Sequence, residues 1–168
     1  MRILGVDPGL RTTGYGIIDV ERDAPVLVEG GIITPNARVP LERRLGELHG
    51  ELCAVLAAAR PDVMVIEELW SGYKNPTTAV LMGHARGVLC LAADVHGVRV
   101  RHLGHSHVKR ALTGSGAARK EQVKRVVMLH LDLRTVPEPD DVSDALALAL
   151  ALANIERAES NLARAGIA

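Results

Sequence analysis

The chain has 168 residues, of which 48% are apolar and 24% charged, and its formal net charge is zero. This length and composition are those of one folded domain, and they exclude a disordered, fibrous or membrane-spanning chain. No basic and apolar leader precedes the first apolar segment, which predicts a cytoplasmic protein. The two cysteines, Cys53 and Cys90, lie in apolar helical patterns, so we expect buried free thiols.

The first third of the chain is predicted to form an antiparallel meander of three strands, at residues 2–7, 14–19 and 26–34. Gly30 and Gly31 are expected to form a bulge in the third strand. The first strand ends at Asp7, where Pro8-Gly9 forces a turn. A carboxylate held there suits a structural turn or a divalent cation site, and this segment alone favours neither.

A helix and a central strand follow the meander. Apolar residues recur every three or four positions from Leu41 to Val55, which predicts an amphipathic helix that ends at Arg60-Pro61. Residues 62–67 then read as a short apolar strand that ends at Glu67, of the kind found inside a covered sheet. A helix followed by a central strand indicates the α/β class.

The second half is predicted to hold four helices and one more strand. After a loop at 71–76 come a helix capped by Thr77 or Thr78, a strand at 98–102, and helices at 105–112, from Arg119, and at 142–155. The last helix is apolar nearly all round, so we expect it to be buried. We expect residues 1–158 to form the folded domain and residues 159–168 to be a disordered tail.

Basic residues are concentrated between positions 99 and 125, although the net charge is zero. This segment has eight arginines and lysines against the single acid Glu121. The basic residues are Arg99, Arg101, Lys109, Arg110, Arg119, Lys120, Lys124 and Arg125. Such a stripe suits a protein that binds phosphates, and a solvated helix face is the alternative. His105 and His107 lack further zinc ligands at suitable spacing, so we interpret them as loop or DNA-backbone residues.

Four acidic residues occupy positions where a solvated surface charge is not expected: Asp7, Glu67, Asp141 and Asp144. The first two end strands, and the last two share one face of the first turn of an apolar helix, where capping is the alternative. If the four converge, their repulsion requires divalent cations. Oxygen ligands without a His/Cys set select Mg²⁺, with Mn²⁺ as a substitute. Two ions about 4 Å apart suit phosphodiester hydrolysis.

Several short motifs occur in a fixed order along the chain. They are Val6-Asp-Pro-Gly with Thr13-Gly-Tyr-Gly16, Ile66-Glu67, Ala85-Arg-Gly-Val88, Gly114-x-Gly116 with Lys120, and Asp141-x-x-Asp-Ala-Leu146. This ordered set, which extends over residues 1–155, resembles that of the RuvC-type Holliday junction resolvases. The resemblance implies a ribonuclease H-like fold, in which helices flank a five-stranded mixed sheet. It also implies a homodimer whose interface includes the helix at 77–94.

The resemblance further implies roles for individual residues. Asp7, Glu67, Asp141 and Asp144 match the metal-binding catalytic carboxylates. Lys109 and Lys120 match basic residues that contact DNA near the active site. Together with neighbouring basic and loop residues, the predicted DNA contacts are Trp70, Tyr73, Lys109, Ser115, Arg119, Lys120 and Lys124. For Tyr73, a plain surface loop is an equal alternative.

The chain departs from the family pattern at three positions. Glu68 follows Glu67, and Asp140 precedes Asp141. The motif spacing selects Glu67 and Asp141 and leaves open whether the neighbouring acids contribute. Trp70 stands where the family usually has a Phe that stacks on unpaired bases, and its larger ring is expected to preserve that role.

The leading hypothesis is a structure-selective DNA endonuclease that resolves four-way junctions in recombination and repair. The resemblance implies symmetric nicks by two active sites, 5′-phosphate and 3′-hydroxyl ends, and a branch-migration helicase complex as partner. An actin-like sugar kinase or ATPase is suggested by Asp7-x-Gly9, but that fold needs two lobes and a longer chain. A non-catalytic junction binder is a third class, and clustered carboxylates argue against it because they repel phosphates.

Overall fold

The computed structural model describes residues 1–21, 24–69 and 75–166 of the chain. Trp70 and Tyr73, two of the predicted DNA contacts, therefore lie outside the described residues. The elements in chain order are β1 (Arg2–Asp7), β2 (Thr13–Glu21), β3 (Ala24–Ile33), α1 (Leu41–Ala59), β4 (Val63–Glu67), α2 (Pro76–Val95), β5 (Arg99–Leu103), α3 (His105–Thr113), α4 (Lys120–His130) and α5 (Asp140–Arg164).

The five strands form one mixed sheet in the order β3-β2-β1-β4-β5. Strands β1, β2 and β3 pair antiparallel, which confirms the predicted meander. Strand β4 pairs parallel with β1, and β5 pairs parallel with β4. The carboxyl ends of β1, β4 and β5 therefore lie at one edge of the sheet.

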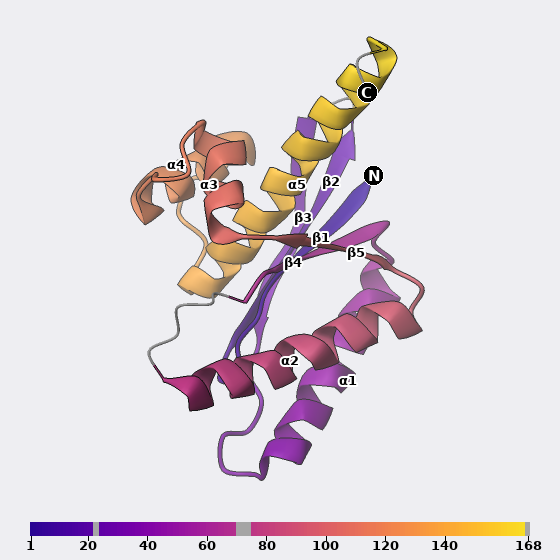
Figure 1. The fold of residues 1–168 in the computed structure, drawn as a ribbon, viewed down its shortest axis with the longest axis vertical. Coiled ribbons are helices and arrows are strands. Elements are labelled where there is room, and N and C mark those ends of the chain that lie inside the picture. Colours follow the sequence, from indigo (N-terminus) through magenta and orange to yellow (C-terminus); the bar gives the residue numbers. More distant parts are fainter. Residues whose placement is uncertain (22–23, 70–74, 167–168) are drawn as a thin grey trace.

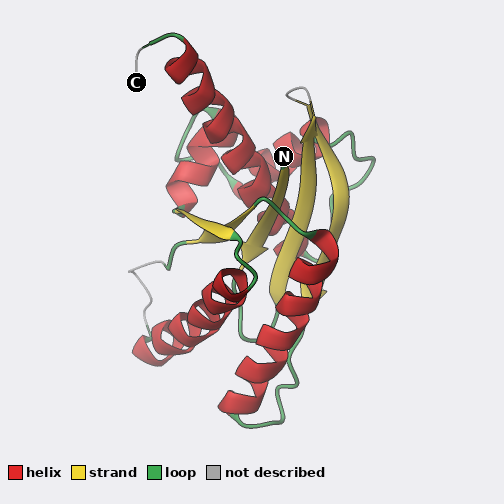
Figure 2. Cartoon of the chain, turned by 90° about the vertical axis from the view of Figure 1, so that its right-hand side faces the viewer, coloured by secondary structure: helices red, strands yellow, loops and turns green. Residues whose placement is uncertain are grey.

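Helices cover both faces of this sheet (Figure 1). One core joins α1 and α2 to strand residues such as Leu4, Val6 and Ile66. The other core joins α3, α4 and α5 to the alternate residues, such as Ile3 and Val65. Figure 2 shows the two layers from the side, with the sheet between them. The alternation arises because successive side chains of a strand point to opposite faces.

Helix α5 packs unusually close to the sheet because glycines face it. A Cβ atom added at Gly5 would lie 2.0 Å from the carbonyl oxygen of Ala145 in α5. One added at Gly16, which pairs with Gly5 across the strands, would lie 2.6 Å from Leu146 Cδ2. The predicted burial of this helix is confirmed, since Leu146 and Ala149 are fully buried.

Helix α5 extends further than the sequence pattern predicts. It begins at Asp140 and continues to Arg164, so residues 159–164 are helical and the expected tail from residue 159 is wrong there. Ion pairs on β5 hold this continuation. Arg99 and Arg101 both contact Glu156 Oε1, at 3.0 and 3.1 Å, and Arg101 also contacts Glu159 at 3.3 Å. Pairs between distant elements are invisible to a local periodicity.

Three other details differ from the expectations. The register shift in the β2–β3 pair falls opposite Ile17 and Ile18, so the irregularity lies near Val28 and not at Gly30-Gly31. The cap of α2 is Asn75, whose side chain accepts a hydrogen bond from the Thr77 backbone N–H at 2.9 Å. Both cysteines are free, as predicted, but only half-buried.

Helix α2 is long and apolar, although the composition of the chain predicts no membrane-spanning segment. Among the described residues it is the one helix that is long and apolar enough, by length and composition, to cross a membrane. Only 22% of that apolar window is buried, and Val80, Leu91 and Val95 are exposed. A single helix of this kind is weak evidence for membrane insertion.

Candidate active site

Two of the predicted carboxylates come from the ends of adjacent parallel strands. Asp7 is the last residue of β1, and Glu67 is the last residue of β4. Val6 pairs with Ile66 in the register, so the two acids follow paired positions. Alternation places Asp7 on the face of Ile3 and Gly5, and Glu67 on the face of Val63 and Val65, which is the α5 face.

Helix α5 brings the other two carboxylates to the same edge. Gly14 pairs with Asp7 across β1 and β2, and a Cβ atom at Gly14 would lie 2.0 Å from the carbonyl oxygen of Asp141. The absence of a side chain at position 14 therefore lets the first turn of α5 rest beside the end of β1. Asp144 lies one turn further along the same helix.

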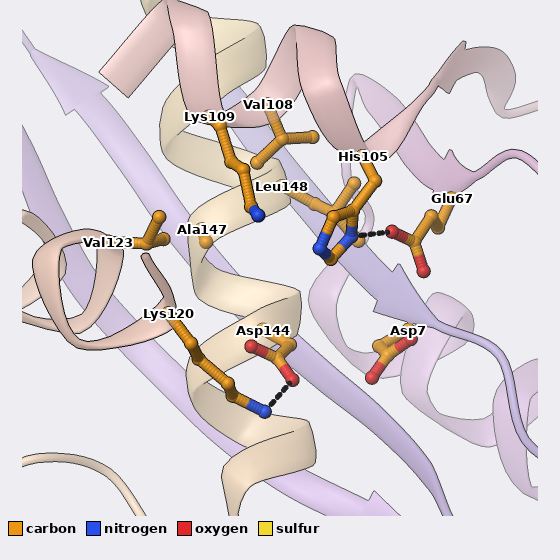
Figure 3. Close-up of a pocket in the computed structure, with 10 residues that line it drawn as sticks. All are labelled: Asp7, Glu67, His105, Val108, Lys109, Lys120, Val123, Asp144, Ala147 and Leu148. Atoms are coloured by element: carbon orange, nitrogen blue, oxygen red, sulfur yellow. Dashed lines mark hydrogen bonds and ion pairs between the residues drawn. The ribbon is translucent and has the colours of Figure 1, made fainter. Parts of the chain in front are cut away.

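Asp7, Glu67 and Asp144 line one pocket, together with His105, Lys109 and Lys120 (Figure 3). Its apolar wall comes from α3, α4 and α5, through Val108, Val123, Ala147 and Leu148. Asp141 does not line this pocket. It lines a neighbouring groove on the other side of the first turn of α5. The structure therefore brings three of the four predicted carboxylates into one cavity and the fourth to its border.

Basic side chains contact two of the pocket carboxylates directly. Lys120 Nζ donates to Asp144 Oδ2 at 2.7 Å and lies 3.2 Å from Asp140 Oδ2 (Figure 3). His105 Nδ1 lies 2.7 Å from Glu67 Oε1 and donates to it, because an ionised carboxylate only accepts. Asp7 contacts neither Lys120 nor His105 in this way (Figure 3).

Asp7 is affected by burial and by the charges around it. Burial, followed by the negative charges of Glu67, Asp144 and Asp141, raises the pKa of Asp7 from 3.8 to about 7. Lys120 opposes this effect. Burial also disfavours the charged form of Lys120, but its hydrogen bonds with Asp144 and Asp140 outweigh burial and raise the pKa of the ammonium group. The cluster therefore has too little positive charge to keep every acid ionised at neutral pH.

The residues fit a divalent metal in kind and in charge. The pocket offers hard carboxylate oxygens, which Mg²⁺ and Mn²⁺ prefer, and the raised pKa of Asp7 reports the missing positive charge. In the described part of the chain, no three His, Cys, Asp or Glu side chains converge closely enough to hold one ion as they stand. Lys120 contacts one oxygen of Asp144, Oδ2, and His105 contacts one oxygen of Glu67, Oε1.

The predicted DNA-contacting residues that the structure describes do not all lie at the pocket. Lys109 and Lys120 line the pocket. Ser115 and Arg119 are exposed around the turn between α3 and α4, outside the pocket. Lys124 donates to Asp140 Oδ1 at 2.8 Å, so its charge is partly used within the protein.

The two neighbouring acids that the sequence left open have separate contacts. Glu68 follows Glu67 in an extended segment, and its carboxylate lies beside Gly104, where an added Cβ would be 2.9 Å from Glu68 Oε2. Asp140 pairs with Lys124 and Lys120 at the border of the pocket. Neither carboxylate lines the pocket that Asp7 and Glu67 share.

Sequence reasoning missed two residues that contact Glu67. His105 was expected to be a loop or DNA-backbone residue, but it begins α3 and holds the Glu67 carboxylate. Arg86 of α2 donates from Nε to the Glu67 carbonyl oxygen at 3.0 Å and from Nη2 to His102 Nδ1 at 2.6 Å. The Ala-Arg-Gly motif that contains Arg86 was a signal, but spacing alone gave it no partner.

The sheet order and the helices on both faces define the ribonuclease H-like fold, and the acidic edge is typical of the nucleases of this class. A family model described as crossover junction endodeoxyribonuclease RuvC matches residues 3–152. The chain belongs to this RuvC family. The crossover junction endodeoxyribonuclease RuvC of Rhodopirellula baltica is 48% identical over 148 residues, which cover 88% of this chain and 83% of the relative.

Solved structures agree with this assignment. The Thermus thermophilus RuvC structure superposes with a TM-score of 0.88 at 34% identity, over 95% of this chain and 97% of the other. T. thermophilus RuvC in complex with Holliday junction substrate has a TM-score of 0.86 at 32% identity, over 94% of this chain and 96% of the other. The ribonuclease H-like fold implied by the sequence motifs is therefore confirmed.

Proposed function

We propose that the protein is a metal-dependent endonuclease that resolves four-way DNA junctions. One observation carries this proposal: Asp7, Glu67 and Asp144, from three different elements, line one pocket whose rim holds Lys109 and Lys120. Carboxylates suit metal ions, and lysines at the rim suit DNA phosphates. The similar T. thermophilus protein was solved with a Holliday junction, which supports this class of substrate.

In this proposal the four predicted carboxylates hold the metal. Asp7, Glu67 and Asp144 face the pocket, and Asp141 borders it from the neighbouring groove. Two bound Mg²⁺ ions per site, or Mn²⁺ ions in their place, would activate water and neutralise charge on the phosphate. Lys120 and Lys109 attract the scissile phosphate and hold it over the carboxylates.

We propose hydrolysis that leaves a 5′-phosphate and a 3′-hydroxyl, two ends that a ligase joins. Two sites acting on strands of like polarity require two copies of the chain. The exposed apolar residues of α2, Val80, Leu91 and Val95, offer the surface for a homodimer. A cytoplasmic location and a branch-migration helicase complex as partner follow from the family and complete the proposal.

A nicking assay on a synthetic four-way junction tests the function. The wild-type protein with Mg²⁺ is expected to cut two opposing strands at equal positions, and EDTA is expected to stop cutting. A linear duplex of the same sequence is the control substrate and is expected to remain intact. Cutting of duplex and junction at equal rates, or cutting in EDTA, would overturn the proposal, and ATP hydrolysis by the pure protein would support a nucleotide-handling enzyme instead.

A further inference from the structure

An open groove of about 650 Å³ lies next to the pocket, between the start of α1, the start of α2 and the turn after β1. Helices α1 and α2 pack on the same face of the sheet (Figure 1). The polar side chains of the groove come from Arg11, Thr12, Arg44, Thr78 and Asp141. None of these residues lines the pocket that holds Asp7.

The groove and the pocket meet at the first turn of α5. Asp141 lines the groove, and Asp144 lines the pocket. Gly9 of the turn after Asp7 also lines the groove. A DNA strand with one phosphate over the pocket carboxylates would therefore pass Asp141 on its way to the groove.

The groove has positive charge that the protein itself does not neutralise. Within the described residues, neither Arg11 nor Arg44 forms a salt bridge, and Asp141 is the one acid in the lining. Lys120 and Lys124 differ, because Asp144 and Asp140 pair with them. Arg44 is half-buried and Arg11 is exposed, and an arginine without a carboxylate partner is available to an external anion.

A hydrogen bond holds the guanidinium of Arg44 in place and leaves another of its N–H donors without a partner among the described residues. Its Nη2 donates to the carbonyl oxygen of Leu10 at 2.8 Å, which fixes the guanidinium against the turn. Its Nε is buried and finds no hydrogen-bond partner among the described residues. Ordinary structural arginines in a fold satisfy such buried donors.

The turn that carries Arg11 is rigid. The Thr13 hydroxyl donates to the Gly9 carbonyl oxygen at 2.6 Å, and the Gly9 N–H donates back to the same hydroxyl at 3.1 Å. Thr13 is fully buried. Arg11 and Thr12 therefore project from a preorganised loop, and little ordering entropy opposes their binding to a ligand.

We propose that this groove binds the backbone phosphate next to the scissile one, on the same DNA strand, through Arg11 and Arg44 with the hydroxyls of Thr12 and Thr78. The groove deepens the proposed function and rests on it. It fixes the strand on one side of the cleavage position, while Lys109 and Lys120 hold the scissile phosphate itself. It is a positioning subsite and takes no part in the chemical step.

Salt dependence of junction binding is the first test. Binding is measured in EDTA by fluorescence anisotropy for the wild type, Arg11→Gln, Arg44→Gln and the control Arg43→Gln, whose exposed side chain neighbours Arg44 in α1 but lies outside the groove. Affinity falls as salt rises, and each groove variant is expected to make the slope of log affinity against log salt less steep by about one. The Arg43→Gln variant is expected to keep the wild-type slope.

Neutral phosphate substitution is the second test. Junctions carry one methylphosphonate in place of each phosphate beside the cleavage position, one at a time. The wild type and Arg43→Gln are expected to cut one of these junctions more slowly than the unmodified junction. Arg11→Gln and Arg44→Gln are expected to cut the unmodified junction slowly, and to cut the same methylphosphonate junction no more slowly than that. Thermal melting establishes that the variants fold, and if Arg44→Gln does not, Arg11→Gln decides the test by itself.

The outcomes separate the two proposals. Groove variants with the wild-type salt slope and wild-type sensitivity to methylphosphonate would overturn the groove proposal while junction cutting by the wild type stands. A wild-type protein that neither binds nor cuts junctions would overturn the proposed function and the groove together.

Discussion

Asp7 has an environment unlike that of any ordinary surface carboxylate. It ends a buried strand, its neighbours are acids, and among the described residues no basic side chain forms a hydrogen bond or ion pair with it. In the folded, metal-free protein the pKa of Asp7 is about 7, whereas in the unfolded chain it is near 3.8. Between these two pH values the folded protein therefore keeps a proton on Asp7 that the unfolded chain releases. Stability of the metal-free protein therefore falls as pH rises from about 4 to about 7, and the loss persists above pH 7.

Replacing Asp7 with Asn is expected to abolish junction cutting and to leave junction binding intact. The neutral side chain also removes the ionisation cost, so Asp7→Asn in EDTA is expected to be more stable than the wild type at pH 8, by on the order of 2 kcal/mol, and no more stable below pH 4. Urea melts at both pH values measure this. Asp132→Asn, at an exposed acid, is the control, and equal gains at both pH values would contradict the explanation.

His105 is predicted to position Glu67. It donates to the carboxylate at 2.7 Å from the first turn of α3. Residues that orient a metal ligand in this way typically change metal affinity about 10- to 100-fold when removed. His105→Ala is expected to weaken Mn²⁺ binding, measured by calorimetry, by about tenfold, and His105→Gln to restore part of it. His107→Ala, two residues along the same helix, is the control and is expected to bind as the wild type does.

At the scale of elements, the site depends on how closely α5 approaches the sheet. Gly14 leaves room for the backbone of Asp141, and Gly5 leaves room for Ala145. The carboxylate on α5 and the carboxylate on β1 come together because two strands lack side chains where the helix rests. The catalytic geometry is thus built by residues that have no chemistry of their own.

Gly14→Ala tests this close packing. The added methyl group would meet the Asp141 carbonyl, so the free energy of unfolding is expected to fall by about 1–3 kcal/mol, and cutting is expected to fall more than junction binding does. Gly46→Ala is the matched control, because an added Cβ there meets nothing within 4 Å in helix α1. That variant is expected to gain about 0.5–1 kcal/mol. Equal stability of both variants would rule out the packing argument.

The sequence predicts elements better than it predicts contacts. Periodicity places the strands and helices, and strand ends identify Asp7 and Glu67, because these signals are local. The pair between Lys120 and Asp144 joins positions 24 residues apart on different helices, and no local pattern shows it. Arg99 and Arg101 belong to the basic stripe in the sequence, yet the fold commits them to Glu156 of α5. Tertiary contacts therefore decide which basic residues of the stripe remain available to a ligand.

At the scale of the whole molecule, α2 presents three large apolar residues to solvent. Val80, Leu91 and Val95 are 59%, 54% and 66% exposed. Arg86 of the same helix donates to the backbone of Glu67, so the surface proposed for dimerisation and the active site are joined through one helix. A partner chain that packs on α2 would therefore contact the same helix whose Arg86 holds the end of β4.

Substituting Leu91 and Val95 together with Glu is expected to convert a homodimer into monomers, because charge cannot be buried in an apolar interface. Sedimentation measures the mass, and a cruciform plasmid that is nicked once instead of being linearised reports the loss of paired cutting. Leu129→Glu is the control, since this leucine of α4 is 79% exposed and lies on the opposite face of the sheet. A double variant that remains dimeric would place the interface elsewhere.

The ion pairs between α4 and α5 have a consequence for selectivity. Lys120 already holds Asp144, and Lys124 already holds Asp140. An anion that approaches Lys120 or Lys124 therefore competes with a carboxylate that already holds the lysine. A DNA strand brings several phosphates at once, so we expect it to displace these carboxylates more readily than a single phosphate ion does. The ion pairs of the resting protein thus favour a polymer over a small anion at these two lysines.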